Sequence, residues 1–258
     1  MFARLKRIVW RVIEAILQAP SLFESRLDWL EWRRRLGCFL QGDGIEIGAL
    51  HQPLPLGATH ISHIRYVDLL TLAQMRQHFP ELSSYRLTAP DVIDDGEVLG
   101  YFPNGSLDFI IANHFIEHAR NPIGAIKVWI NKLKPGGIIW MAIPHRHYTF
   151  DVDRPLSSLE HLINDDVLPP DVRKTYDFEH YLEWSESVCK KSGEAIDQYA
   201  HQLAQSGEAI HFHTFDGTSF LRIISHIREK LLLPLDILAY VDASEKTGEF
   251  LIVLSKRK

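Results

Sequence analysis

Two apolar segments with a helical segment between them constrain the fold of this 258-residue chain more than any other feature. Residues 107–113 and 138–143 are nearly continuous apolar runs, which is typical of strands covered on both faces. Asn121 and Pro122 predict a helix start, with Asn at the N-cap and Pro at the first helical position. The turn Lys-Pro-Gly-Gly at 134–137 ends this helix. Strand, helix and strand in this order predict a parallel β-α-β unit.

The same alternation extends in both directions along the chain. We predict a turn at 42–44, short strands at 45–47, 65–68 and 85–92, a helix at 70–78, a helix at 216–230, and strands at 235–241 and 249–254. The last two strands are joined so closely, by a turn at 243–248, that they must pair antiparallel. The predicted fold is α/β, with a doubly wound, mostly parallel seven-stranded sheet and a terminal antiparallel hairpin. Ligands of such sheets bind at the carboxyl ends of the strands.

The chain divides into two predicted parts. Residues 1–38 form an N-terminal helical segment, and residues 39–258 form the main domain. Within that domain, residues 145–210 lose the strand–helix alternation, and an insertion of this length is expected to act as a substrate lid. Residues 1–19 form a basic amphipathic helix. Such a helix packs on its own domain or a partner subunit, which we favour, or lies on an anionic membrane surface.

Net charge and cysteine content limit which classes of binding partner and which cellular compartment the sequence predicts. The net charge of −5 argues against nucleic acid as a partner. Cys38 and Cys189 form no CxxC motif, so we expect neither a disulfide framework nor a zinc knuckle. No apolar run is long enough to span a membrane. These features predict a cytoplasmic protein, with contact at the inner membrane face if residues 1–19 bind lipid.

A nucleotide-like cofactor requires a glycine turn after a strand and an acid at the end of the next strand. Glu46-Ile47-Gly48 supplies the turn, and Asp68, about 20 residues further on, supplies an acid suited to ribose hydroxyls. Asp94 and Asp95 follow in order along the chain, and Asn113 ends the apolar strand.

Residues 106–137, SLDFIIANHFIEHARNPIGAIKVWINKLKPGG, resemble the later half of bacterial class I S-adenosylmethionine-dependent methyltransferase domains of type 11. The resemblance covers roughly residues 42–150, and it implies S-adenosyl-L-methionine as the cofactor. It places the cofactor's amino acid portion beside Glu46, Gly48 and Ala49, and the ribose at Asp68. It places the adenine at Asp94 or Asp95, and the methionine portion or the substrate at Asn113. A methyltransferase-fold scaffold without cofactor is the alternative.

Methyl transfer to a hydroxyl is helped by a base that removes the hydroxyl proton. Three histidines follow the predicted strands at the expected edge: His114 after the first apolar strand, and His145 and His147 after the second. One of the latter two is the preferred base, and His118 is expected to be structural. The predicted acceptor is a small molecule or a glycan, methylated at oxygen. Several other side chains could contact it, but each also has a structural interpretation: Arg146, Arg154, Tyr176, Phe178, Tyr181 and Trp184.

The 14 histidines raise the question of a metal. His211-Phe212-His213 would place two imidazoles on one side of a strand, and further candidate ligands lie in the insertion at His161, His180, Asp151 and Asp153. The spacing matches no known ligand signature, so we assign no metal from sequence. A metal-dependent enzyme that uses the insertion stays an alternative.

Overall fold

The computed structural model describes residues 21–57 and 59–258. The predicted basic helix at 1–19 lies outside these residues. The described helices are α2 (Ser21–Leu36), α3 (Leu72–His78), α4 (Pro122–Lys132), α5 (Leu159–Val167), α6 (Pro170–Ser187), α7 (Glu194–Ser206) and α8 (Gly217–Glu229). The strands are β1 (Gln41–Ile47), β2 (His60–Asp68), β3 (Val92–Ile93), β4 (Leu107–Asn113), β5 (Leu133–Pro144), β6 (Leu235–Val241) and β7 (Glu249–Lys256).

The seven strands form one sheet in the order β3-β2-β1-β4-β5-β7-β6. All neighbours are parallel except β7, which runs antiparallel to both β5 and β6. The predicted α/β fold with a terminal antiparallel hairpin is therefore confirmed. The order reverses direction at β1 and β4, and ligands of open α/β sheets bind outside the strand ends at such a point.

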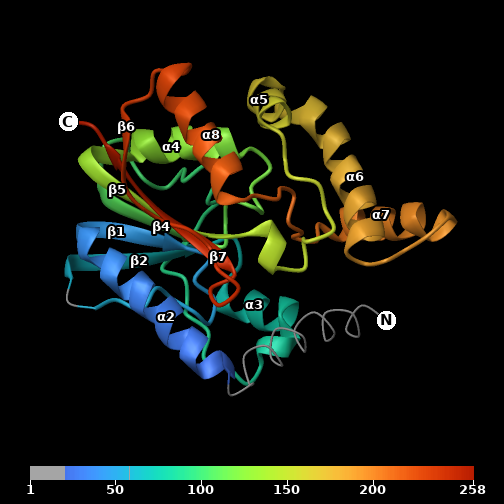
Figure 1. Ribbon diagram of the computed structural model, residues 1–258, viewed down its shortest axis with the longest axis horizontal. Coiled ribbons are helices and arrows are strands. Elements are labelled where there is room, and N and C mark those ends of the chain that lie inside the picture. Colours follow the sequence, from blue (N-terminus) through green and yellow to red (C-terminus); the bar gives the residue numbers. More distant parts are fainter. Residues whose placement is uncertain (1–20, 58) are drawn as a thin grey trace.

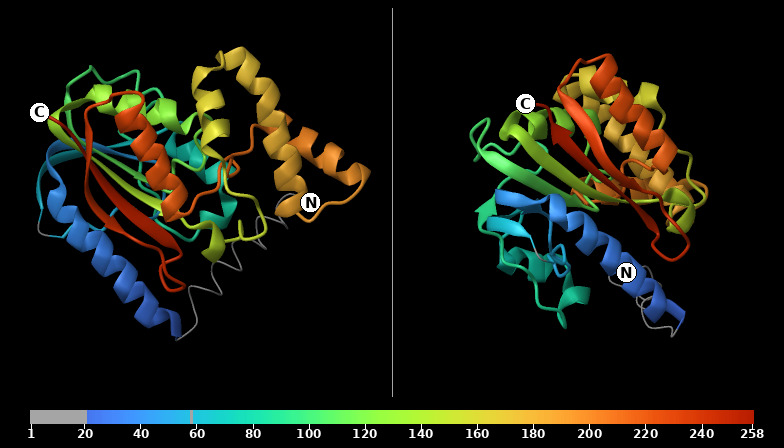
Figure 2. Two further views of the ribbon diagram at one scale, coloured as in Figure 1. Left: turned by 45° about the horizontal axis from the view of Figure 1, so that its top comes forward. Right: turned by 60° about the vertical axis from the view of Figure 1, so that its left-hand side comes forward.

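Both faces of the sheet are covered (Figure 1). Alternate side chains of β4 enter two separate cores, because successive strand residues point to opposite faces. Ile110 joins the larger core, which lies under α4 and α8 and includes Trp129 and Phe220. Phe109 joins the smaller core, in which Leu36 at the end of α2 packs. Figure 2 shows α2 and α8 on opposite faces of the sheet. Burial on both faces explains the continuous apolar runs.

Four local predictions were wrong; the last is the turn expected at 134–137, whose residues belong to β5. Residues 42–44, expected as a turn, belong to β1, where Gly42 has a φ of +76° and the pairing register shifts between Gly42 and Asp43. The third strand, expected at 85–92, is limited to Val92–Ile93. Residues 211–213, expected as a strand, form none. The first error arose because glycine is the usual turn residue, yet here it accommodates a bulge.

Helices α5, α6 and α7 form a lobe to one side of the sheet (Figures 1 and 2). Residues that follow β4 and β5 contact this lobe and the segment after it. The His118 ring bonds the Ile210 carbonyl at 2.8 Å, and the Arg146 N–H donates to the Phe215 carbonyl at 2.8 Å. The lobe therefore adjoins the carboxyl ends of the strands, where a lid would act. Among the described helices, none is both long and apolar enough to span a membrane.

Candidate functional site

The carboxyl ends of β1, β2 and β4 meet at one edge of the sheet. Ile47 pairs with Val67 of β2 on one side and with Ala112 of β4 on the other. The N–H of Gly48 donates to the Val67 carbonyl at 2.9 Å. The glycine turn and Asp68, 20 positions apart in sequence, are therefore neighbours in space.

Gly48 has a left-handed backbone, with a φ of +65°. A Cβ atom built there would meet no described atom within 4 Å, so the conformation and not crowding requires glycine. Space lies directly beside the backbone at this turn. Leu50, two residues later, also has a positive φ, of 44°. The chain thus keeps a left-handed conformation in this loop without a second glycine.

Asp68 ends β2 and is partly buried. One carboxylate oxygen accepts the Leu70 N–H at 2.9 Å. Burial raises the pKa of this carboxyl, and the backbone N–H groups of Leu70 and Leu69 oppose the rise. The carboxylate is held at the edge where a hydroxyl-bearing ligand would meet it.

Glu46 lies on β1, two residues before Gly48, and its exposed fraction is 1%. Its Oε1 accepts the Leu54 N–H at 2.8 Å and the Asn113 amide at 3.1 Å. Its Oε2 and the Asn113 Oδ1 are buried and have no hydrogen-bond partner among the described residues. Burial raises the pKa of Glu46 to about 7. Two acceptor atoms at the β1–β4 junction are therefore ready for a donor such as an ammonium group.

The other predicted cofactor residues shape loops beside this junction. Ala49 is buried, and its carbonyl accepts the Gln52 N–H at 2.9 Å. The Asp94 N–H donates to the Asp68 carbonyl at 3.0 Å, which joins the β3 loop to β2. The Asp94 and Asp95 carboxylates accept backbone N–H groups of their own loop at 2.8–2.9 Å.

His114 follows Asn113 directly and has a φ of +48°. This backbone turns its ring toward the start of β7, where Nε2 lies 2.6 Å from Glu249 Oε2. Arg33 of α2 holds the same carboxylate through two hydrogen bonds of 2.7 and 2.8 Å. Burial alone would raise the pKa of Glu249, but Arg33 and His114 outweigh burial and lower it to about 2. The His114 side chain remains 45% exposed.

A second group of side chains surrounds Glu117, whose two carboxylate oxygens are buried without a hydrogen-bond partner in the described chain. His114 Nδ1 lies 3.8 Å and His211 Nε2 4.0 Å from its Oε1. His211 Nδ1 bonds Asp151 at 2.7 Å. Burial raises the pKa of Glu117, and burial lowers that of His118 to about 3.

His145 and His147 flank a short 3-10 turn, Arg146–Tyr148, directly after β5. The His145 Nδ1 accepts the His147 N–H at 3.2 Å, which places the ring proton on Nε2. Burial lowers the pKa of His145. His147 is exposed, and its ring lies 5.1 Å from that of Tyr148.

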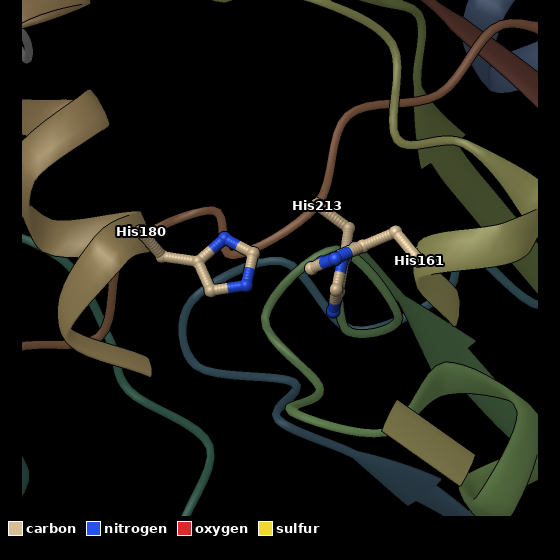
Figure 3. Close-up of side chains that lie close together, drawn as sticks. All are labelled: His161, His180 and His213. Carbon is tan, nitrogen blue, oxygen red and sulfur yellow. The ribbon is translucent and has the colours of Figure 1, made fainter. Parts of the chain in front are cut away.

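His211 and His213 enter different clusters. His213 lies with His161 and His180, and Figure 3 shows the three side chains together. His211 instead belongs to the group around Glu117 and Asp151. The expectation of two imidazoles on one side of a strand is therefore wrong, because the segment forms no strand. Asp153 lies apart, in an exposed pair with Lys190.

Most of the other candidate acceptor contacts are committed to packing. Arg154 is 2% exposed and bonds Asp151 and Glu183, each at 2.7 Å. Phe178, Tyr181 and Trp184 pack in a small core between α6 and α7. Tyr176 is exposed, and Arg146 is partly exposed.

Sequence reasoning missed Arg33, Glu249 and Asp165. Arg33 and Glu249 lie 216 positions apart, so no local spacing connects them. Asp165 had a usable signal, because it lies four residues after His161 on a helix and therefore on the same face.

A hollow of about 700 Å³ opens elsewhere, at the amino ends of the strands, beside Asp108, Gly136 and Asp236. Both acids that line it are paired: Lys134 bonds Asp108 at 2.7 Å, and Arg257 bonds Asp236 at 2.9 Å. These pairs give Asp108 a structural role far from the glycine turn.

Comparison with known proteins identifies the domain. Residues 48–141 match the family model described as a methyltransferase domain, of type 11. No curated protein matches the chain. Three solved structures resemble it at low identity. The first is the CurJ carbon methyltransferase (12% identity, TM-score 0.43, covering 98% of this chain and 54% of that one). The second is a Bacillus halodurans protein assigned as a methyltransferase (10% identity, TM-score 0.49, covering 89% of this chain and 99% of that one). The third is a Listeria monocytogenes protein assigned as an S-adenosylmethionine-dependent methyltransferase (14% identity, TM-score 0.49, covering 91% of this chain and 99% of that one).

The chain spans about half the length of the CurJ protein. The domain assignment rests on the family model and on its agreement with the observed sheet order. The match includes the Gly48 turn, Asp68 and the β4 end. Residues 48–141 of this chain therefore form a methyltransferase domain of type 11, the domain type that the sequence resemblance implied.

Proposed function

We propose that the chain is a class I S-adenosylmethionine-dependent methyltransferase and that it transfers the methyl group to a hydroxyl oxygen of a small-molecule or glycan-like acceptor. The observation that carries the proposal is the Glu249–His114 pair beside Asn113, at the end of β4. A carboxylate-held imidazole next to the cofactor edge is suited to remove a hydroxyl proton.

In this proposal Glu46, Gly48, Ala49, Asp68, Asp94, Asp95 and Asn113 hold the cofactor. Asp68 accepts from the ribose hydroxyls, and the partnerless oxygens of Glu46 and Asn113 accept from the amino acid portion. The Gly48 turn lets the ligand approach the backbone. Asp94 and Asp95 order the loop that borders the adenine. The cofactor would supply a methyl group bound to a sulfonium sulfur: the acceptor oxygen would bond to that carbon as the carbon–sulfur bond breaks, and neutral S-adenosylhomocysteine would leave.

His114 is the base that the local hydrogen bonds favour. In the neutral tautomer that donates Nε2–H to Glu249, Nδ1 carries the lone pair that takes the acceptor proton, and this atom lies 3.8 Å from Glu117 Oε1. His145 uses its Nδ1 lone pair for the His147 N–H, so it is less suited to this step. His145 and His147 instead lie where they can contact the acceptor, after the neighbouring strand. Positioning and proton removal together account for the catalytic contribution of these residues.

Turnover with an acceptor panel tests this proposal. The panel comprises sugars, oligosaccharides and phenols, with amines and thiols for comparison, and methyl transfer from labelled cofactor is identified by mass spectrometry and NMR. We expect methyl ethers as products. Turnover restricted to amines, thiols or carbon acceptors contradicts the proposal.

Replacement of the base provides a residue-level test. We expect His114→Asn to lower kcat by roughly 10²–10⁴-fold while cofactor affinity stays close to wild type. His63→Asn is the matched control, because His63 also bonds a carboxylate, that of Asp43, at 2.9 Å, but at the amino end of the sheet. Equal kcat values in both variants would remove His114 from the mechanism.

A further inference from the structure

Three imidazoles from three separate segments meet beside the insertion. His161 comes from α5, His180 from α6, and His213 from the segment before α8. Their ring centroids are 5.0, 5.2 and 5.4 Å apart in pairs, and one nitrogen of each lies within 4.8 Å of the others. Figure 3 shows the rings gathered around one region.

A carboxylate completes the group. Asp165 lies one helical turn after His161 on α5, and its Oδ2 is 3.3 Å from His161 Nε2 and 3.8 Å from His213 Nε2. All three atoms are buried without a hydrogen-bond partner among the described residues. Asp165 and His213 are themselves only 3% and 1% exposed. Buried polar atoms are rarely left without partners, so their convergence on one region indicates a missing ligand.

The charge around the group also bears on a cation. Two of the nearby guanidinium groups are paired, Arg120 with Asp177 and Arg154 with Asp151 and Glu183. A third, Arg173, donates to the Leu168 carbonyl at 3.0 Å. Asp165 is a buried carboxylate, 3% exposed, so a positive charge beside it would be favourable.

We propose that His161, Asp165, His180 and His213 bind one zinc ion. Zinc takes imidazole and carboxylate ligands in a tetrahedral arrangement, in which neighbouring ligand atoms lie roughly 3.3 Å apart. The 3.3 and 3.8 Å separations are close to that value. Calcium and magnesium prefer oxygen ligands, so a set with three imidazoles disfavours them.

The site would fasten the insertion to the catalytic domain. Its ligands join α5 and α6 to the segment that carries His213, and the His213 N–H donates to the Glu117 carbonyl at 3.1 Å. Four protein ligands leave no open coordination position, which is typical of structural zinc. The His161 side chain is 37% exposed, which gives the ion a path of entry. This role is independent of the acceptor proposed above.

Glu117, His118 and His211 form the alternative group of metal-ligating side chains. That group offers two imidazoles and one carboxylate, and Glu117 Oε1 lies 3.8 Å from His114, the proposed base. It therefore belongs to the acceptor edge of the sheet. A metal held there is a distinct outcome of the experiment.

Metal content of the purified full chain, with any affinity tag removed, tests the proposal. After stripping with chelator, reloading with zinc and dialysis, we expect close to one zinc per wild-type chain. His161→Gln and Asp165→Asn should each weaken zinc binding roughly 100-fold or more. His201→Gln is the matched control, because His201 and Asp197 form an exposed pair with the same four-residue spacing and 3.3 Å separation. Far-UV circular dichroism verifies that each variant is folded.

Two further readouts distinguish the outcomes. Cobalt bound in place of zinc should give the visible absorption of a tetrahedral ion in wild type and in His201→Gln only. Chelator should lower the Tm of these two proteins and leave that of His161→Gln unchanged. A folded wild-type chain that retains no zinc overturns the proposal. Zinc that persists in His161→Gln also overturns the proposal. If His118→Gln then removes that zinc, the ion is bound by the group of Glu117, His118 and His211 instead.

Discussion

Glu46→Gln should change how the stability of the enzyme depends on pH. The Glu46 carboxyl is 1% exposed, and burial raises its pKa from 4.5 to about 7 against the opposing effects of the Leu54 N–H, Arg33 and Asn113. In the unfolded chain the group ionises near pH 4.5. In the folded enzyme ionisation is delayed until about pH 7.

The direction and size of the effect follow from this difference. A group whose folded pKa is raised contributes stability that is complete below pH 4.5 and is lost as pH rises through 7. The full loss amounts to roughly 3 kcal/mol, most of it between pH 5 and pH 8. Glutamine keeps an oxygen that accepts the Leu54 N–H but does not ionise. Relative to wild type, Glu46→Gln should therefore be more stable at pH 8 than at pH 5 by roughly 2–3 kcal/mol.

Urea denaturation of the cofactor-free protein at pH 5 and pH 8 measures this difference. Glu229→Gln, at an exposed glutamate on α8, is the control and should show no comparable change. If the stability difference between Glu46→Gln and wild type is the same at both pH values, the assigned titration of Glu46 is wrong.

Three further changes have outcomes that follow from single contacts. Arg33→Ala leaves the Glu249 carboxylate buried without its guanidinium partner and should lower the free energy of unfolding by about 3–5 kcal/mol in a urea titration. Arg35→Ala removes an exposed pair with Glu31 and an exposed contact with the Trp32 ring, and it should cost less than about 1 kcal/mol in the same titration. Asn121→Ala removes the side-chain cap that accepts the Gly124 N–H at 2.8 Å and should destabilise by about 1 kcal/mol, measured by thermal denaturation. Gly48→Ala and Gly105→Ala each place a Cβ atom on a residue with a left-handed backbone, and each should lower the free energy of unfolding by roughly 1–2 kcal/mol. Only Gly48→Ala should also weaken the binding of S-adenosylhomocysteine, measured by calorimetry.

The fold was predictable where burial imposes a pattern on the sequence. Residues 107–113 and 235–241 match β4 and β6 to the residue, and Asn121 caps α4 as expected. The start of β2 was missed because residues 60–64 mix polar residues with two isoleucines and are exposed or partly exposed, so no apolar run marks them. The third strand was overextended because it contributes only two residues to the sheet.

The site was predictable only where it follows the strand ends. Gly48, Asp68 and Asn113 could be placed because parallel strands bring their carboxyl ends to one edge. Arg33 and Glu249 could not, since long-range ion pairs leave no periodic signal. The sequence shows how many histidines lie in and beside the insertion but not which of them lie together. Residues 208–215 lie outside any helix or strand, and the course of this segment determines which imidazoles His211 and His213 contact.

Calorimetric titration with S-adenosylhomocysteine tests the central claim that the cofactor lies between the Gly48 turn and Asp68. We expect one binding site in the wild-type chain, loss of most of the affinity in Asp68→Ala, and wild-type affinity in Asp43→Asn, an exposed acid at the amino end of the same sheet. Unchanged affinity in a folded Asp68→Ala variant would contradict the account.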